Sequence, residues 1–466
     1  MSHWIDGGIR MEIKGKQVLV FGSGISGVAA SQLLLEEGAR VILYDGNEGL
    51  NAEQICKSIL DGTKEDQQEN IRVILGELPE EVLDTLALTV MSPGVPTDLP
   101  IVEKMREKKI PIWGEIELAY VYGKGDVLAI TGTNGKTTTT ALLGEIMKGY
   151  KEHTYVVGNI GNPYTSVARS IPEDSVTVAE MSSFQLETVH TFAPKVSAIL
   201  NITPDHLNRH HTMEAYIDAK KKIAMNQTED ETCVLNYEDE VTRAFGNEIK
   251  AKVFYFSSQR KLEHGIYLED GKIIYKEKEP VLVCHVNDLK LLGVHNYENV
   301  MAAVAMAAAY GVPMESIRNT ICAFQGVEHR IEFVAEKHGV AYYNDSKGTN
   351  PDAAIKGIQA MNRPTLLIGG GYDKDSSYGE WIDAFDGKVK KLILIGATRE
   401  KIAKEAKEHG FVDYIFADTF EEAVQICVDN AEVGDAVLLS PACASWGMFR
   451  NYEERGDRFK ELVNQL

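Results

Sequence analysis

The stretch TGTNGKTTTT, residues 131–140, defines the fold at the middle of this chain. An apolar run at residues 127–130 precedes it, and an alanine- and leucine-rich run at residues 141–147 follows it. This order predicts a strand, a glycine-rich loop and the start of a helix. Glycines in such a loop let backbone N–H groups close around an anion, and the helix N-terminus adds unpaired donors. The stretch therefore predicts a phosphate-binding loop, with an ordinary glycine-rich turn as the alternative.

Residue types within this loop predict how it binds a nucleotide. The Lys136 ammonium can reach the terminal phosphates, and the Thr137 hydroxyl can ligate Mg²⁺. Ile130 stands where the common P-loop has its first glycine, so the sequence is a shortened GxxGKT variant. The predicted nucleotide-binding residues of the loop are Gly132, Thr133, Asn134, Gly135, Lys136, Thr137 and Thr138.

A second glycine-rich turn, GSGISG at residues 22–27, lies near the N-terminus. It joins a strand-like run to a helical run, and Asp45 follows about 20 residues later, as in the dinucleotide fingerprint. Read alone, the turn favours NAD, with Asp45 on the adenine-side ribose; more broadly, it predicts a nucleotide diphosphate at a helix N-terminus. Two nucleotide-type loops predict two nucleotide ligands in separate domains. A dehydrogenase has no need for the second loop, and a GTPase switch has no need for the first.

Length, charge and cysteine content narrow the class of protein. A chain of 466 residues predicts about two to four domains. The formal charge of −21 argues against a general nucleic-acid binder, although local cations and helix termini can still bind anionic small molecules. Six cysteines without a CxxC pair predict reduced thiols, and no apolar run approaches the roughly 20 residues of a membrane span. We therefore expect a soluble, cytoplasmic protein, with residues 1–10 as a candidate N-terminal extension.

Strand-like and helical runs alternate along most of the chain, which predicts an α/β fold with mostly parallel sheets. Domain boundaries are expected just before the phosphate loop and again near residue 326. They give an N-terminal domain at residues 1–114, a central domain at 115–326 and a C-terminal domain at 327–466. The segment 252–292 is richer in strands, and we expect an appended antiparallel piece there.

The last domain is predicted to contain four strands, at residues 340–343, 365–368, 392–395 and 436–439. Polar loops follow three of them, and ligands of open α/β sheets bind at the carboxyl ends of strands. Lys347, Thr349 and Lys374 supply cations and a hydroxyl in these loops, so we expect a third site there.

Several single residues are candidates for chemistry. Glu180 ends an apolar strand beside the phosphate loop, which suits a Mg²⁺ ligand; the alternative is a helix-capping acid. His206 follows another strand, but hard cations prefer oxygen, so the residue alone favours a polar loop histidine. Lys220 begins a run of three lysines, a pattern that usually marks a solvated helix face. Arg330 could clamp a phosphate, and amide side chains at 293–299 could contact a purine edge.

Together these motifs resemble the muramyl ligase family, whose members use ATP to add amino acids to a UDP-linked peptidoglycan precursor. The resemblance spans essentially the whole chain in family order. It is carried by TGTNGKT (131–137), GNIG (158–161), EMSSFQLE (180–187), NITPDHLNRH (201–210), AYIDAK (215–220), GVHNYEN (293–299), HR (329–330) and DSKGTN (345–350). The GSGISG turn and SPACASWGMFRNYEERG (440–456) are similar to the branch that adds D-glutamate, and the DNPR-type motif of the next ligase is absent.

The resemblance implies Rossmann-like N- and C-terminal domains with parallel sheets that flank a central P-loop-type ATPase domain. It also implies that the first glycine turn holds UDP and that no nicotinamide is used. The residues implied for the UDP substrate are Gly22, Ser23, Gly24, Ile25, Ser26, Gly27, Asp45, Ser92, Pro93, Gly94 and Asn159.

The same resemblance implies the remaining site residues, with ATP as co-substrate and two Mg²⁺ ions. The catalytic residues are Lys136, Glu180, His206 and Lys220. The metal ligands are Thr137, Glu180, His206 and, if CO₂ carbamylates its amine, Lys220. The further ATP contacts are Asn296, Asn299, Arg330 and Asp345. The D-glutamate contacts are Lys347, Thr349, Lys374, Ser445 and Tyr452, the last in place of a phenylalanine seen in relatives.

We therefore expect an ATP-dependent amide ligase that joins D-glutamate to UDP-N-acetylmuramoyl-L-alanine through an acyl phosphate. Its substrates are these two compounds and ATP; we expect no nucleic-acid partner, no membrane span and a monomer. The alternatives are another ligase of this family, a folylpolyglutamate synthase-like enzyme, an NAD-dependent dehydrogenase and an ATP-dependent switch.

Overall fold

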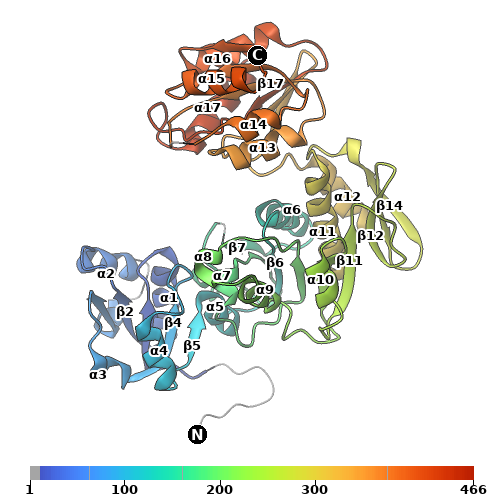
Figure 1. Ribbon diagram of the computed structural model, residues 1–466. Helices are drawn as coiled ribbons and strands as arrows, with labels where there is room; N and C mark the ends of the chain where they lie inside the picture. Colours follow the sequence, from blue (N-terminus) through green and yellow to red (C-terminus); the bar gives the residue numbers. More distant parts are fainter. Residues whose placement is uncertain (1–10, 62, 64, 160, 375) are drawn as a thin grey trace. The chain divides into compact units, whose positions relative to one another are not determined.

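A computed structural model describes residues 11–466 except 62, 64, 160 and 375. The chain forms two compact units (Figure 1). The first comprises the chain up to Glu269 together with 273–283 and 299–317, and the second comprises 270–272, 284–298 and 318–466. The predicted extension at residues 1–10 lies outside the described residues. Within the described part of the chain, no helix is both long enough and apolar enough to cross a membrane.

The N-terminal part of the first unit is a five-stranded parallel sheet with the order β3-β2-β1-β4-β5 (Figure 1). Its strands are β1 (Gln17–Phe21), β2 (Arg40–Asp45), β3 (Ile71–Leu75), β4 (Leu86–Met91) and β5 (Ile112–Gly114). One face packs against α1 (Ile25–Glu36) and α5 (Glu115–Tyr122), and the other against α3 (Glu80–Leu83) and α4 (Pro100–Glu107). The remaining elements are α2 (Ala52–Leu60) and the 3₁₀ helix η1 (Glu65–Asn70). The predicted Rossmann-like sheet is confirmed.

Apolar strands buried on both faces explain this sheet. Leu19 and Val20 of β1 are fully buried and belong to the two opposite cores. The register places Phe21 beside Tyr44 and Met91 on the neighbouring strands. Because the strands are parallel, the loops that follow β1, β2 and β4 meet at one edge of the sheet.

The central sheet has nine strands in the order β14-β13-β12-β11-β10-β9-β6-β8-β7. They are β6 (Asp126–Thr131), β7 (Thr154–Gly158), β8 (Val176–Glu180), β9 (Val196–Ile199), β10 (Thr232–Asn236), β11 (Lys252–Ser257), β12 (Gly265–Glu269), β13 (Lys272–Lys276) and β14 (Pro280–His285). The helices of this region are α6 (Lys136–Lys148), α7 (Ser183–Leu186), α8 (Leu207–His210), α9 (Met213–Lys221), α10 (Glu240–Phe245), α11 (Val294–Tyr310) and α12 (Met314–Ala323), with 3₁₀ helices η2 (Tyr164–Ser166) and η3 (Val286–Asp288). The strands from β7 to β11 pair in parallel, as predicted for a central α/β domain.

The segment 252–292 is rich in strands, as predicted, but the expected antiparallel appendage is wrong at its start. β11 pairs in parallel with both β10 and β12, so the central sheet continues through it. The fully buried Phe256 anchors β11 in the core, because its period-two pattern buries one face of the strand. A short alternating pattern does not specify the direction of pairing, which explains the error.

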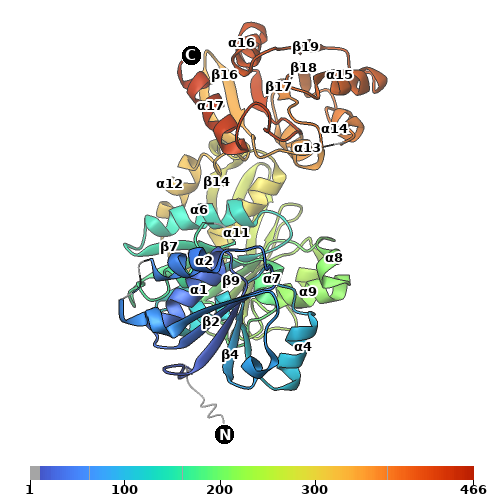
Figure 2. The same cartoon turned by 90° about the vertical axis from the view of Figure 1, so that its left-hand side faces the viewer.

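The second unit contains a six-stranded sheet with the order β15-β16-β20-β17-β18-β19. Its strands are β15 (Glu332–Lys337), β16 (Val340–Asn344), β17 (Thr365–Gly369), β18 (Val389–Leu394), β19 (Tyr414–Phe416) and β20 (Ala436–Leu439). One face packs against α13 (Pro351–Ala360), α14 (Gly379–Asp383) and α15 (Arg399–Glu408), and the other against α16 (Phe420–Asn430) and α17 (Tyr452–Asn464) (Figure 2). All four predicted strands are present. The sequence missed β19 and the edge strand β15, which is antiparallel to β16.

Candidate active site

The phosphate loop lies between β6 and α6, in the strand-loop-helix order that the sequence predicts. Gly132 has φ +151° and Gly135 has φ +87°, conformations that favour glycine. A Cβ atom on Gly135 would lie 2.1 Å from Oδ1 of Asn299, so this amide of α11 lies directly against the loop. Asn296, earlier on α11, donates from Nδ2 to Leu292 O at 2.8 Å. The loop presents backbone N–H groups at a helix N-terminus, an arrangement that suits phosphate.

Asn201, which follows β9, holds the phosphate loop in shape. Its carbonyl accepts from Thr133 N at 2.9 Å, and its Oδ1 accepts from Asn134 N at 2.8 Å. Its Nδ2 donates back to Asn134 O at 3.1 Å. Asn201 belongs to the NITPDHLNRH motif, but the sequence does not predict this role, because its partner Asn134 lies 67 positions away in the sequence.

Two lysines converge on one carbonyl of the phosphate loop. Lys136 Nζ donates to Gly132 O and to Thr133 O, each at 2.9 Å, and Lys220 Nζ donates to Gly132 O at 2.7 Å. Lys220 is 2% exposed, and its ammonium lies 4.7 Å from the ring centre of Tyr216. Burial, together with the charge of Lys136, lowers the pKa of Lys220 to about 7. The structure thus brings two of the predicted catalytic residues together.

The other two lysines of the run point elsewhere. Lys221 forms an ion pair with Glu248 at 2.8 Å, and Lys222 donates to the carbonyl of Glu187 at 2.5 Å. Helix α9 places only one residue of three consecutive positions on a given face, because successive residues turn by about 100°. The interpretation of Lys220 as part of a solvated face is therefore wrong, while its neighbours remain partly exposed.

Glu180 ends β8, beside β6 and the start of the phosphate loop. Its side chain is buried, and its Oε1 accepts from Nδ2 of Asn159 at 2.7 Å. Its Oε2 is also buried, and among the described residues it has no hydrogen-bond partner. The next helix is capped by Ser182 and Gln185 in a capping box, so Glu180 is not the helix-capping acid that the sequence left open. An unpaired buried carboxylate oxygen suits a hard cation.

His206 lies at the start of α8 in a left-handed conformation, with φ +53°. Its ring is about half exposed and lies 4.9 Å from the Phe184 ring. His210, one turn later, is buried and contacts Ser183 Oγ at 2.9 Å and Glu187 Oε1 at 3.3 Å, and burial lowers its pKa. In the described part of the chain, neither a hydrogen bond nor an ion pair joins His206 to another predicted metal ligand.

The N-terminal glycine turn is held by Asp45. Oδ2 of Asp45 accepts from Ser23 N at 2.9 Å and from Ser23 Oγ at 2.6 Å, and Oδ1 accepts from Asn47 N at 3.0 Å. Partial burial alone would raise the pKa of Asp45, but these hydrogen bonds outweigh it and lower the pKa. Ser92 Oγ donates to Gly22 O at 3.3 Å, which joins the turn to the predicted loop after β4. Asp45 therefore holds the turn in shape, and its contact with the UDP substrate stays a prediction.

Two further residues of this turn, Ile25 and Gly27, have distinct structural features. Ile25 begins α1 and is 79% exposed, which is unusual for a large apolar side chain at the carboxyl edge of a sheet. A Cβ atom on Gly27 would lie 1.8 Å from Gly22 O, so this position requires glycine. The close helix–strand packing is the role of the last glycine in the fingerprint.

Arg209 and Glu115 are two residues of this region that the sequence analysis missed. Arg209 Nη2 donates to Val95 O and to Glu187 Oε2, each at 2.9 Å, and its guanidinium lies 4.8 Å from the ring centre of Phe184. Both residues line a small cavity together with Ser92 and Pro93, two of the residues predicted for the UDP substrate. Glu115 is buried, and burial raises its pKa. Only a three-dimensional fold could reveal these contacts, since each joins segments far apart in sequence.

Asp345 in the second unit is buried rather than open to a ligand. Its Oδ1 accepts from Ile331 N at 3.3 Å, and its Oδ2 accepts from Ser440 Oγ at 2.7 Å. Burial raises the pKa of Asp345 to about 7, against the opposing charges of Arg330 and Arg455. Its predicted contact with a ribose remains a prediction.

The loops after β16 and β20 carry most of the residues predicted for D-glutamate. Lys347 Nζ lies 5.8 Å from the ring centre of Tyr452, and Thr349 N donates to Lys347 O at 2.8 Å. Burial and Glu453 raise the pKa of Tyr452 to about 12. Ser445 is buried in the neighbouring loop. Since β16 and β20 are adjacent parallel strands, their loops meet at one sheet edge.

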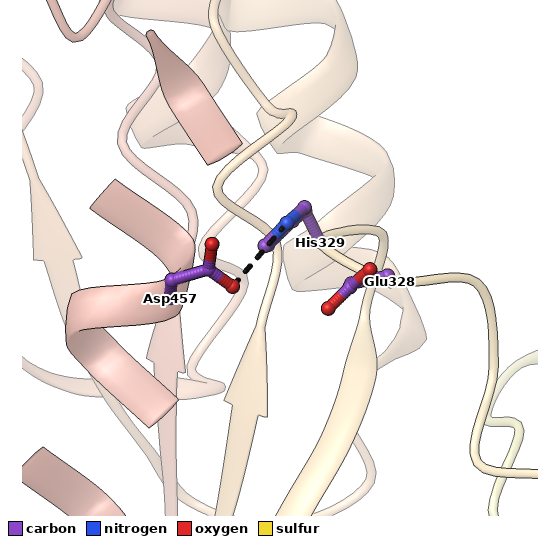
Figure 3. A group of neighbouring side chains, drawn as sticks. All are labelled: Glu328, His329 and Asp457. Atoms are coloured by element: carbon purple, nitrogen blue, oxygen red, sulfur yellow. Dashed lines mark ion pairs between the residues drawn. The ribbon is translucent and has the colours of Figure 1, made fainter. Parts of the chain in front are cut away.

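Three potential metal ligands lie together in the second unit, as Figure 3 shows: Glu328, His329 and Asp457. The ring of His329 lies 5.9 Å from the ring of Tyr452. Nε2 of His329 is 3.8 Å from Oδ1 of Asp457. The Lys460 ammonium forms ion pairs with Glu328 and, at 3.1 Å, with Asp457. The same ammonium pairs with both carboxylates, so we assign this cluster to the ion-pair network of α17.

The fold and the first unit's site define a class: P-loop-type nucleotide-binding α/β proteins. Family models match three successive stretches: "Mur ligase MurD-like, N-terminal domain" at residues 16–114, "Mur ligase middle domain" at 130–307 and "Mur ligase, glutamate ligase domain" at 329–443. The chain belongs to the Mur ligase family, which confirms the resemblance seen in its motifs.

Curated relatives match over nearly the full length. A UDP-N-acetylmuramoylalanine--D-glutamate ligase of Lachnoclostridium phytofermentans is 58% identical, with 98% of this chain and 99% of the relative covered. A protein of the same name from Lachnospira eligens is 56% identical, with 98% and 100% covered. Among solved structures, MurC of Thermotoga maritima aligns with a TM-score of 0.56 at 19% identity, covering 97% of this chain and 99% of that one. MurF of Thermotoga maritima in complex with ADP aligns with a TM-score of 0.54 at 16% identity, covering 98% and 97%. These two share the fold.

Proposed function

We propose that this protein is an ATP-dependent ligase that joins D-glutamate to UDP-N-acetylmuramoyl-L-alanine, a step of peptidoglycan precursor synthesis. The observation that carries the proposal is the match of 58% and 56% identity, over nearly whole chains, to relatives named for this reaction. The phosphate loop with two converging lysines supports the ATP-dependent step. ADP and phosphate are the other products, because amide formation from a free carboxylate needs an activated acyl group.

The reaction has two steps in this proposal. The alanyl carboxylate of the UDP substrate attacks the γ-phosphate of ATP, and ADP leaves, which gives an acyl phosphate. The amine of D-glutamate then attacks the acyl carbon, phosphate leaves, and the amine loses a proton. Lys136 is placed to interact with the phosphate charge, since its ammonium lies within the phosphate loop, 2.9 Å from the carbonyl oxygens of Gly132 and Thr133.

The residues of the first unit fit a divalent cation. The buried Oε2 of Glu180 has no partner among the described residues, and Thr137 lies at the start of α6 directly after Lys136. We propose that Glu180, Thr137 and His206 hold two Mg²⁺ ions, which would neutralise the negative charge of the phosphates when bound. Asn159 orients Glu180 through its hydrogen bond of 2.7 Å, so it has a supporting role besides its predicted contact with the UDP substrate.

Lys220 is the lysine of its run that suits carbamylation. Carbamate formation joins a neutral amine to CO₂ and releases one proton, and the product carries two carboxylate-like oxygens. Lys220 is buried beside the phosphate loop, where its environment favours the neutral amine. A carbamate there would place anionic oxygens where a cation beside Gly132 can use them.

The amino-acid site is proposed at the carboxyl edge of the second unit's sheet. Lys347, Thr349, Lys374 and Ser445 lie on loops after β16, β17 and β20, which are neighbours in the sheet, and Tyr452 begins α17. Two lysine ammoniums there suit the two carboxylates of a dicarboxylic amino acid. The six cysteines are free thiols, which supports the cytoplasm as the compartment, and we propose a monomer.

Phosphate release tests the proposal. The purified chain is incubated with Mg²⁺, ATP, UDP-N-acetylmuramoyl-L-alanine and one amino acid from a panel of D- and L-isomers. We expect release with D-glutamate and an amide product of the matching mass. Release with another amino acid would favour a different Mur-type or folylpolyglutamate synthase-like ligase. NADH fluorescence that changes on adding the protein would favour the dehydrogenase alternative.

A further inference from the structure

Two loops at the carboxyl edge of the second unit's sheet expose large apolar side chains. Tyr372 is 46% exposed and Trp446 is 53% exposed, while the strands that lead to them are buried. Their rings lie 5.6 Å apart at 64°, a T-shaped contact. Trp446 is exposed at this edge, so packing in the core does not account for the tryptophan. An exposed aromatic side chain in this place suggests a role in binding.

The backbone fixes both loops against each other. Tyr372 N donates to Ala444 O at 2.9 Å, and the two residues form an isolated antiparallel bridge. A Cβ atom on Gly371 would lie 2.4 Å from Ala444 O, so only glycine permits this approach. Trp446 and Lys374 each follow the bridge by two residues, and their relative position is set by this pairing.

Lys374 lies over the indole of Trp446, with 4.9 Å from Nζ to the ring centre. Among the described residues, no carboxylate lies within ion-pair distance of this ammonium. A carboxylate partner would cancel the charge and occupy its donors. An aromatic face attracts the cation but leaves its N–H groups free for a ligand.

We infer that Trp446 is a positioning residue that holds the Lys374 ammonium for the side-chain carboxylate of the incoming amino acid. This inference rests on the proposed function. Lysine has four rotatable side-chain bonds, so an unsupported ammonium must be ordered when the substrate binds. The indole restricts that freedom beforehand. It therefore contributes to the choice of D-glutamate over D-glutamine, which has the same shape but a neutral side chain.

Steady-state kinetics on the full chain test this role. Trp446→Leu keeps apolar bulk and removes the aromatic face; Trp446→Phe keeps an aromatic face. For Trp446→Leu we expect the KM for D-glutamate to rise about fivefold, with kcat and the KM for ATP within about twofold. The preference for D-glutamate over D-glutamine, as a ratio of kcat/KM, should fall by a similar factor. Trp446→Phe should restore most of the loss.

Two further variants decide the mechanism. In a Lys374→Met background, Trp446→Leu should have no additional effect on the KM for D-glutamate, because the indole then has no ammonium to hold. Phe416→Leu is the matched control: Phe416 is also exposed under a cation, with Arg399 at 5.7 Å, but lies on the edge strand β19. We expect it to leave all constants unchanged.

An unchanged KM in Trp446→Leu, a full effect of Trp446→Leu without Lys374, or failure of Trp446→Phe to restore the KM would each overturn the inference. These outcomes differ from failure of the proposed function, in which the wild-type protein itself shows no phosphate release stimulated by D-glutamate.

Discussion

Separate replacement of the three consecutive lysines at the end of α9, Lys220 to Lys222, tests which of them belongs to the nucleotide site. Lys220 is 2% exposed and donates to Gly132 O at 2.7 Å, whereas Lys221 pairs with Glu248 at the surface. We expect Lys220→Ala to lower kcat by about a hundredfold or more, the usual cost of removing a preorganised charged group from such a site. Lys221→Ala should leave kcat within about twofold, because surface ion pairs contribute little.

The magnitude follows from the two environments. A buried hydrogen bond to a charged donor contributes about 1.5–3 kcal/mol, or roughly tenfold to a hundredfold in rate if it acts in the transition state. Loss of the proposed carbamate, with its metal-binding oxygens, would add to this cost. Lys222 donates to Glu187 O at 2.5 Å and has no contact with the phosphate loop among its described hydrogen bonds. Lys222→Ala should therefore lower the melting temperature and have only a small effect on kcat.

The pKa of Lys220 supports the same choice. Because the pKa of Lys220 is lowered from 10.5 to about 7, about half of the Lys220 amines are neutral at pH 7, against about one in 3,000 for an ordinary lysine. CO₂ reacts only with the neutral form. We therefore expect one carbamate signal in ¹³C NMR spectra of protein equilibrated with ¹³C-labelled bicarbonate at neutral pH, and its loss in Lys220→Ala alone.

The assays are phosphate release and ¹³C NMR on the wild type and on each single variant, with thermal melts to confirm folding. Lys220→Met, which keeps the bulk of the side chain, replaces Lys220→Ala if the latter unfolds. A short carboxylate such as formate should partly restore activity in the variant that lacks the carbamate. Near-wild-type activity in both Lys220 variants, with loss in Lys221→Ala, would refute the reasoning.

Three further predictions concern binding, stability and pH. Gly135→Ala should weaken ATP binding more than about tenfold in calorimetry, since φ is +87° and a Cβ would meet Asn299; Gly149→Ala, at φ −74°, is the tolerated control. Glu117→Gln should lower the free energy of unfolding by about 3 kcal/mol in urea titrations. Each carboxylate oxygen of Glu117 accepts from a backbone N–H, so the amide NH₂ of glutamine would face an N–H donor in either orientation. The control Glu145→Gln, at an exposed position, should change the free energy of unfolding little. The melting temperature of the wild type should fall relative to that of Asp345→Asn as the pH rises from about 4 to 7. The reason is that Asp345, with its raised pKa, binds more protons in the folded state than in the unfolded state. Melting temperatures of the two proteins that change in parallel with pH would contradict this.

The sequence predicted the elements that depend on local patterns. The apolar run, glycines and lysine of residues 127–136 specify a strand, a loop and a helix start without help from the rest of the chain, and these are observed. Buried parallel strands of the N- and C-terminal sheets were also predicted, because their near-continuous apolar runs are specific. The direction of β11 and the edge strand β15 were not, since short alternating patterns do not specify a partner.

The residues of the candidate site were predictable where the local sequence pattern itself indicates a role. Lys136 and Glu180 follow from strand ends and the glycine loop. The choice of Lys220 over its neighbours required the fold, because a run of lysines carries no information about which helix face is buried. Arg209 and Asn201 could not be predicted, since their roles depend on hydrogen bonds to Val95 and Asn134, far away in sequence.

Two buried carboxylates of the first unit, Glu117 and Glu180, differ in whether the fold supplies hydrogen-bond partners for both of their oxygens. Glu117 is fully buried, and its two oxygens accept from four donors at 2.6–3.2 Å, all on residues 190–192. Such a group is already satisfied, so replacing it should affect stability and not substrate constants. Glu180 is equally buried but has one oxygen satisfied by Asn159 and one without a partner among the described residues. A buried carboxylate that is left half-paired lowers stability unless a ligand completes it, so we expect a bound cation to offset the cost of burying Glu180. Added Mg²⁺ should therefore raise the melting temperature of the wild type and of Glu117→Gln, but not of Glu180→Gln.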